Sequence, residues 1–130
     1  MEDEYVASQS VLNSVKDICG IHPTNSDFDR DLIPAINSVL FILYQEGLAD
    51  KAYRINDELT TWGDILLNGQ SPEAISTIIE WVGLRTKLIF DPPTSSSLMD
   101  ALKQNIDELE WRGFITNNYV GEIGRLYGDR

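Results

Sequence analysis

The stretch SPEAISTIIEWVGLRTKLIFDPPTSSS (71–97) decides the fold, because it holds both the clearest helix start and the clearest break in the chain. Ser71 stands where an N-cap is needed, and Pro72 stands at the first helical position, where its missing N–H costs nothing. Glu73 places a carboxylate in the first turn, beside the positive end of the helix dipole. The pattern therefore predicts a helix over Pro72–Phe90.

This predicted helix is apolar on nearly every side. One face carries Ile75, Ile78, Ile79, Val82 and Ile89. Away from that face lie Trp81, Leu84 and Leu88. A helix that is apolar all round is buried on more than one side. In a chain of this size we expect either a central helix or one shared with a neighbouring subunit.

The helix is followed by Asp91-Pro92-Pro93-Thr94-Ser95, which we interpret as a stiff structural elbow. Each proline fixes its own φ angle and restricts the residue before it. No acid–base partner is available to activate the hydroxyl groups as nucleophiles. We expect Ser96 or Ser97 to cap a last long helix that runs to about Arg112 and is oriented by the elbow.

The last helix has an apolar stripe at helical spacing and an i,i+4 pair formed by Glu108 and Arg112. The stripe consists of Leu98, Leu102, Ile106 and Leu109. After it, the residues from Phe114 to Arg130 are rich in glycine but carry more apolar side chains than a solvated tail would use. We therefore divide the chain into a helical domain (1–113) and a C-terminal interaction arm (114–130).

Two further helices are predicted upstream. The first lies within Ser10–Cys19, with Ser8 or Ser10 as its cap and Gly20 just past its end. Its apolar face is Val11, Leu12, Val15 and Ile18. The second lies within Asp27–Glu46 and ends at Gly47; its stripe is Leu32, Ile36, Val39, Leu40 and Leu43, widened by Ile33, Ile42 and Tyr44. Its candidate caps are Ser26 with Asp29 in a capping box, or Asp31.

Between these helices and the central one, the signals are shorter. Thr61 with Asp64 three residues later predicts one or two helical turns. The segment Ala52–Asp57 alternates weakly, so Tyr53–Asn56 could form a short β segment. The sequence thus predicts an all-α fold: a small bundle of about four helices plus a short helical turn, with an extended or partly ordered C-terminal tail.

Composition limits the possible partners. The 130 residues suit one domain, and the hydrophobic fraction of 42% is enough for a core. Asp and Glu number 21 against 10 Lys and Arg, for a formal charge of −11. With so few and so scattered cations, binding to nucleic acid or to a membrane surface by charge is disfavoured. The start MEDEYVASQS is not a signal peptide, so we expect a soluble chain made in the cytoplasm.

No constellation of residues indicates catalysis. The single cysteine, Cys19, allows no intrachain disulfide, and with His22 it supplies only two of the roughly four ligands of a zinc site. Asp27, Asp29 and Asp31 begin like a calcium loop, but the glycine and glutamate that such a loop needs later are missing. No phosphate loop or nucleophile elbow is present. We therefore predict an assembly or interaction protein that is not an enzyme and needs no metal or cofactor.

The candidate contact residues are aromatic and aliphatic side chains beyond what one small core needs, together with one arginine. Tryptophans in such positions are core or interface anchors more often than ligand stackers. The expected partner or subunit interface comprises Trp81, Arg85, Trp111, Phe114, Ile115, Tyr119, Ile123, Leu126 and Tyr127.

Three segments together resemble a known family. They are VLNSVKDICGIHPTNSDFDRDLIPAINSVLFILYQEGL (11–48), TTWGDILL (60–67) and WVGLRTKLIFDPPTSSSLMDALKQNIDELEWR (81–112). Over Val11–Arg112 the chain resembles the small head–tail connector proteins, also called head-completion or adaptor proteins, of long-tailed phages and prophages of Gram-positive hosts. The most specific parts are Leu88–Ser96 and the motif LEWR at Leu109–Arg112.

The resemblance implies a small helical bundle whose copies form a homo-oligomeric ring, commonly dodecameric, in the virion. Such a ring sits on the portal protein at the capsid vertex, lets the genome pass through its channel, and receives the next connector, stopper or tail-completion protein. A net negative charge suits a channel that must not hold DNA tightly. The alternative hypothesis is a cytosolic acidic helical regulator or DNA mimic, which would expose an ordered row of carboxylates.

Overall fold

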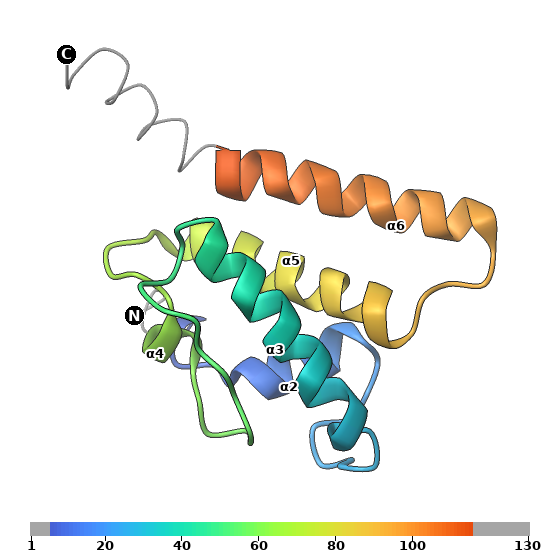
Figure 1. Cartoon of the computed structure of the whole chain (residues 1–130), viewed down its shortest axis with the longest axis horizontal. Coiled ribbons are helices and arrows are strands. Elements are labelled where there is room, and N and C mark those ends of the chain that lie inside the picture. Colours follow the sequence, from blue (N-terminus) through green and yellow to red (C-terminus); the bar gives the residue numbers. More distant parts are fainter. Residues whose placement is uncertain (1–5, 116–130) are drawn as a thin grey trace.

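The structure, a computed structural model, describes residues 6–115 and is all-α within them (Figure 1). Its helices are α2 (Val11–Ile18), α3 (Asp29–Gln45), α4 (Trp62–Ile65), α5 (Pro72–Phe90) and α6 (Ser96–Leu109). A π-helical turn, η1 (Glu110–Ile115), continues α6. No helix in this described range is long and apolar enough to cross a membrane. The predicted small α-helical bundle is confirmed.

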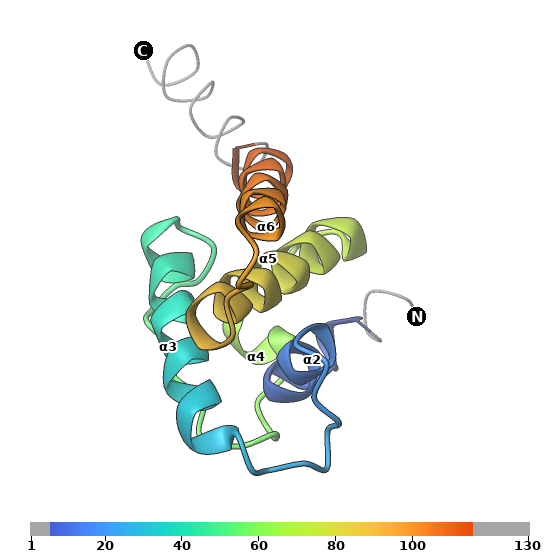
Figure 2. The same ribbon diagram turned by 90° about the vertical axis from the view of Figure 1, so that its right-hand side faces the viewer.

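The α5 helix is the centre of the bundle. Helices α2, α3 and α6 all pack against it, from different sides (Figure 2). Ile78, Trp81 and Val82 have no exposed surface at all, as expected for a helix covered on several faces. Ile89 was expected on the same buried face but is 53% exposed, because in the last turn of α5 the side that packs against the core carries Leu88 and Phe90. There Phe90 packs instead, with its ring edge-on to Phe28 at 5.9 Å.

Most helix starts follow the predicted caps. The Ser71 hydroxyl accepts a hydrogen bond from the Ala74 N–H at 3.1 Å, and the Ser10 hydroxyl accepts one from the Asn13 N–H. The capping box formed by Thr61 and Asp64 at α4 is also present. Each of these caps satisfies backbone donors that the helix itself leaves unpaired.

Two predicted caps were wrong. The N-cap of α6 is Ser95, one residue before the predicted candidates, and its hydroxyl accepts from the Leu98 N–H. The N-cap of α3 is Phe28, which has no side chain able to cap, so neither Ser26 nor Asp31 holds that position. The reason lies in a tertiary contact, because the Asp29 carboxylate is engaged by a lysine from another helix.

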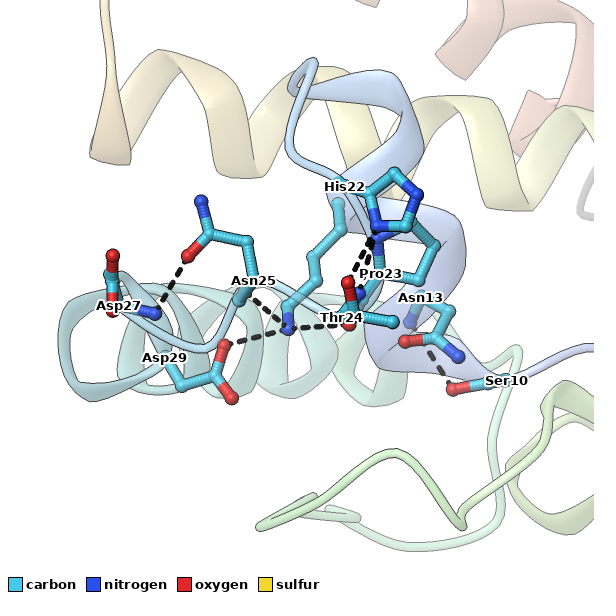
Figure 3. A network of polar contacts seen from close by, with 9 residues as sticks. Ser10, Asn13, His22, Pro23, Thr24, Asn25, Asp27 and Asp29 are labelled. Carbon is cyan, nitrogen blue, oxygen red and sulfur yellow. Dashed lines mark hydrogen bonds and ion pairs between the residues drawn. The ribbon is translucent and has the colours of Figure 1, made fainter.

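That lysine is Lys16 on α2, which is only 2% exposed. Its ammonium lies 2.9 Å from Asp29 Oδ1 and donates to the carbonyl oxygens of Asn25 at 3.0 Å and Pro23 at 3.3 Å (Figure 3). A buried ammonium is tolerated only when its three donors are paired, and here all three are. The network fastens the loop between α2 and α3 and fixes where α3 begins.

The weakly alternating segment Ala52–Asp57 contains no strand, so the β segment near Tyr53–Asn56 is not formed. The Asn37 side chain makes the backbone hydrogen bonds that a neighbouring strand would make in a sheet. Buried Asn37 on α3 donates from Nδ2 to the Ile55 carbonyl at 3.0 Å and accepts from the Ile55 N–H at 2.7 Å. Both backbone groups of Ile55 are thereby satisfied without a sheet, and Ile55 itself is buried.

Helix α2 approaches α5 closely at Gly83. A Cβ atom added at this position would lie 2.9 Å from both Cβ and Cγ2 of Ile18. Atoms that close to the backbone end of a side chain cannot move away without a shift of α2 itself. Gly83 is therefore required by the packing of the two helices and not by backbone conformation.

We expect Lys16→Met to destabilise the fold by about 2 kcal/mol. That is below the roughly 3–5 kcal/mol typical of breaking a fully buried pair, because the Asp29 side chain keeps 29% exposure. Urea denaturation followed by circular dichroism measures the change. Exposed Lys51 provides the control, and Lys51→Met should cost less than about 0.5 kcal/mol. Equal stability of the two variants would show that the network does not fasten the loop.

We expect Gly83→Ala to destabilise the fold by about 1–2 kcal/mol, although alanine is the better helix former by about 1 kcal/mol. The physical cause is the steric conflict with Ile18. A double-mutant cycle with Ile18→Ala tests this cause by urea denaturation. In the Ile18→Ala background, Gly83→Ala should be neutral or stabilising. A cost that persists there would contradict close packing as the reason.

Candidate interaction surface

Helix α6 is the outer layer of the described chain. It returns over α5 after the elbow and packs mainly on that one helix (Figures 1 and 2). Its inner face buries Leu102, Ile106 and Leu109, which agrees with most of the predicted stripe. Leu98 was expected on that stripe but is 62% exposed, because it lies in the first turn of α6, next to the elbow. Trp111, just past the other end of α6, is 66% exposed.

The elbow residues Asp91–Ser95 join the two helices as a short connection. The Asp91 N–H donates to the Lys87 carbonyl at 2.8 Å and closes the last turn of α5. Ser95 then caps α6, and its hydroxyl lies 2.9 Å from that of Ser97. Between these two fixed ends stand Pro92 and Pro93, whose φ angles are restricted. The seam between α5 and α6 is thus closed at one end by a stiff connection.

A hollow of about 620 Å³, the elbow groove, lies along this seam. Its walls come from the end of α2, the second half of α5, the elbow and the first half of α6. The lining residues that matter here are Ile18, Leu84, Lys87, Asp91, Leu98 and Ala101. A second hollow of about 230 Å³ shares Leu84 and Asn105 with it and continues toward Arg112. Together the two hollows run along the length of α6.

The predicted contact residues on α5 are Trp81 and Arg85, and both make contacts within their own chain. Trp81 has no exposed surface and belongs to the core. The Arg85 guanidinium lies over its indole ring at 5.6 Å and pairs with Glu110 of η1 at 3.6 Å. Arg85 therefore joins α5 to η1 within one chain. This partly exposed ion pair contributes little by itself, but the stacking on Trp81 restrains the side chain.

The remaining predicted contact residues lie at or beyond the end of the described chain. Phe114 and Ile115 belong to η1. Tyr119, Ile123, Leu126 and Tyr127 lie outside the described residues.

The structure adds an aromatic pair on α3, one member of which the sequence pattern had assigned to the core. Tyr44, expected to widen the buried stripe, is 40% exposed, and Phe41 beside it is 48% exposed. Their rings lie 6.2 Å apart in a tilted arrangement. A strict count of the helical period along the buried stripe of Ile36, Val39 and Leu43 puts Phe41 on the opposite side and Tyr44 at the border. The pair therefore stands outside the core, as this count would have indicated.

A scan of known protein families provides the decisive comparison. The model of the family described as "Phage connector protein" matches residues 11–119. The chain belongs to this family. No curated protein and no solved structure matches the chain. The match begins at the first residue of α2 and extends through η1, past Arg112, where the resemblance seen in the sequence ended.

Family membership gives this connector protein a structural role in a phage particle, in contact with other head or tail proteins. The geometry agrees with such a role in one respect. The elbow groove is lined mainly by apolar side chains and by two charged ones, Lys87 and Asp91, a composition that suits the binding of a protein segment.

Cys19 and His22 do not form a site together in the structure. Within residues 6–115, no three His, Cys, Asp or Glu side chains are placed to hold a metal ion. The His22 ring contacts Thr24, since Nδ1 accepts from the Thr24 N–H at 3.2 Å and lies 2.8 Å from its hydroxyl. Burial raises the pKa of the Cys19 thiol; the Lys87 ammonium opposes this rise, and the Asp91 carboxylate adds to it.

We expect Cys19 to be alkylated by iodoacetamide more slowly in the native connector protein than in urea at the same pH. A raised pKa leaves less thiolate, which is the reactive form. Lys87→Met should move the rate profile to higher pH, because a charge that favours thiolate is lost. Asp91→Asn should move it to lower pH. Mass spectrometry of the alkylated chain gives the rates, and shifts of the opposite sign would contradict the assigned causes.

Proposed function

We propose that this protein is the subunit of a head–tail connector ring that docks on the portal at the capsid vertex. The ring extends the DNA channel and joins the head to the next connector, stopper or tail-completion protein. The observation that carries the proposal is the family match, because it includes every helix from α2 to α6 as well as η1.

The exposed side of α6 supports contacts between subunits. Leu98 and Trp111 stand at its two ends, and each leaves more than half of a large apolar side chain in solvent. Large apolar side chains such as these are frequent anchors of protein interfaces when a partner covers them. A closed ring needs two different faces on each copy, one for each neighbour. Helices α6 and α3 lie on different sides of α5 (Figure 2), and α3 carries the exposed pair Phe41 and Tyr44, so the two helices can supply the two faces.

The charge supports a channel through which DNA moves freely. The chain carries a formal charge of −11, so copies arranged in a ring repel a phosphate backbone on average. Binding by release of counterions needs clusters of Lys and Arg. In the described chain Lys16, Arg85 and Arg112 are paired with carboxylates of their own chain. A channel wall that does not attract the DNA phosphates lets the genome pass without binding it.

The alternative of an acidic regulator or DNA mimic has less support. A DNA mimic needs a regular row of free carboxylates. Here Asp29, Glu108 and Glu110 pair with cations, and Asp64 caps a helix. These carboxylates serve the fold of their own chain.

We expect deletion of residues 116–130 to leave the bundle folded and to impair assembly. Among the residues that the structure describes, those of the buried core cluster lie between Val11 and Leu109 and form a core by themselves. We therefore expect the free energy of unfolding to change by less than about 0.5 kcal/mol. Circular dichroism and urea denaturation measure this. Electron microscopy of the chain mixed with the portal protein of the same phage then tests for rings, with the intact chain as the control.

The same deletion in the phage should give DNA-filled heads without tails. Tailed, infectious particles from phage with this deletion would contradict the role of the segment in assembly, and such particles from phage that lack the whole protein would contradict the connector role. Loss of folding in the deletion variant would instead place residues 116–130 in the core.

A further inference from the structure

We propose that the elbow groove is the receptor for the C-terminal segment, residues 116–130, of a neighbouring copy. The inference rests on the proposed ring, since it names the contact by which one subunit holds the next. The occupant is a second copy of this chain. Three features support it: the form of the groove, the pattern of the segment and the place where the described chain ends.

The receptor side has the form of a site for an amphipathic segment. The volume of about 620 Å³ lies in the range of pockets that bury most of a bound group. Ile18, Leu84 and Leu98 make its apolar lining, and Leu98 keeps 62% of its surface exposed. Lys87 and Asp91 place one positive and one negative charge at the wall, four residues apart on the chain.

The segment has the matching pattern. It is TNNYVGEIGRLYGDR (116–130), and on a helix its apolar residues Tyr119, Ile123 and Tyr127 would share one face through 4-residue spacing. On the same helix Glu122 would border that face, and Arg130 would continue it three residues past Tyr127. The segment thus offers charges of both signs to the groove wall: Glu122 and Asp129 at the border of the apolar face, and Arg130 in line with it. Paired opposite charges set the register of a docked segment more than its affinity.

The geometry favours a neighbour over the same chain. The described chain ends at Ile115 in η1, which continues α6 at the end far from the elbow (Figure 1). The 14 residues of α6 alone span about 21 Å from the elbow to Leu109, and η1 lies beyond them. To reach its own groove, the chain would have to reverse at once and run back along α6. The 15 remaining residues, 116–130, span up to about 50 Å when extended and about 22 Å as a helix, so they extend well beyond the described chain in either form.

This pairing gives a head-to-tail contact, since the arm of one copy enters the groove of the next. Such heterologous contacts close into a ring when the rotation between copies permits. The stiff elbow then has a specific role, because it holds the groove open between α5 and α6 at a fixed angle.

Disulfide trapping between two different full-length chains tests the pairing. Both chains carry Cys19→Ser. One carries Ala101→Cys at the groove, and the other carries Gly124→Cys in the segment, which leaves its apolar face intact. The chains are mixed in a glutathione buffer and analysed on non-reducing gels. A control pair replaces Ala101→Cys with Glu58→Cys, an exposed site in the loop before α4.

We expect the groove pair to form mixed dimers about tenfold more readily than the control pair, because docking raises the local concentration of the two thiols. Adding Leu98→Glu to the groove chain should reduce this yield to the control level. Leu98 is exposed, and circular dichroism verifies that this variant is folded. Equal yields from the groove and control pairs would overturn the inference. So would a single chain carrying both cysteines that closes on itself and leaves no dimer.

Electron microscopy of rings on the portal separates this inference from the proposed function. Rings that assemble normally with the Leu98→Glu chain overturn the groove as receptor and leave the connector role standing. Mixed dimers without any ring on the portal support the groove and refute the ring.

Discussion

The burial of α5 is the constraint on which the rest of the structure depends. A helix with apolar side chains on nearly all sides is stable in water only when other elements cover most of its surface. Full burial of side chains such as Ile78, Trp81 and Val82 contributes about 1.5–3 kcal/mol each, so the three together are comparable with the net stability of a small domain. Helices α2, α3 and α6 supply the cover, so their positions are set largely by α5.

Because α5 must be covered, α2 has to approach it closely and the start of α3 has to be held in place. Gly83 lets α2 come near enough to α5 for Ile18 to fill the space where a side chain would stand. Lys16 on the opposite side of α2 then holds the start of α3 through Asp29 and two carbonyl groups. The cost of burying the ammonium is offset by three acceptors around it. Helices α2 and α3 touch each other little, and the Lys16 network holds them in one arrangement around α5.

Features governed by local chemistry could be predicted from the sequence. Caps such as Ser71 and the Thr61–Asp64 box act within three residues, and helical periods repeat within a few turns. Features governed by contacts distant along the chain could not. The start of α3 depends on Lys16, and the segment around Ile55 depends on Asn37, 18 residues away. No local pattern marks a lysine or an asparagine that will be buried with its partners.

The interaction surface, too, could be predicted where it depends on local pattern and not where it depends on contacts distant along the chain. The surplus of apolar residues on α5, α6 and beyond could be recognised, but periodicity alone could not separate core from surface. Trp81 is buried, whereas Leu98, at the predicted stripe, is exposed, because α6 is covered by a single helix and its first turn extends past it. The groove arises only when the elbow folds α6 back over α5. Among the described residues, α6 is held mainly by α5, so much of its surface is uncovered by them. In a protein whose family joins phage parts, the least covered helix is therefore the element best placed to carry the assembly contacts.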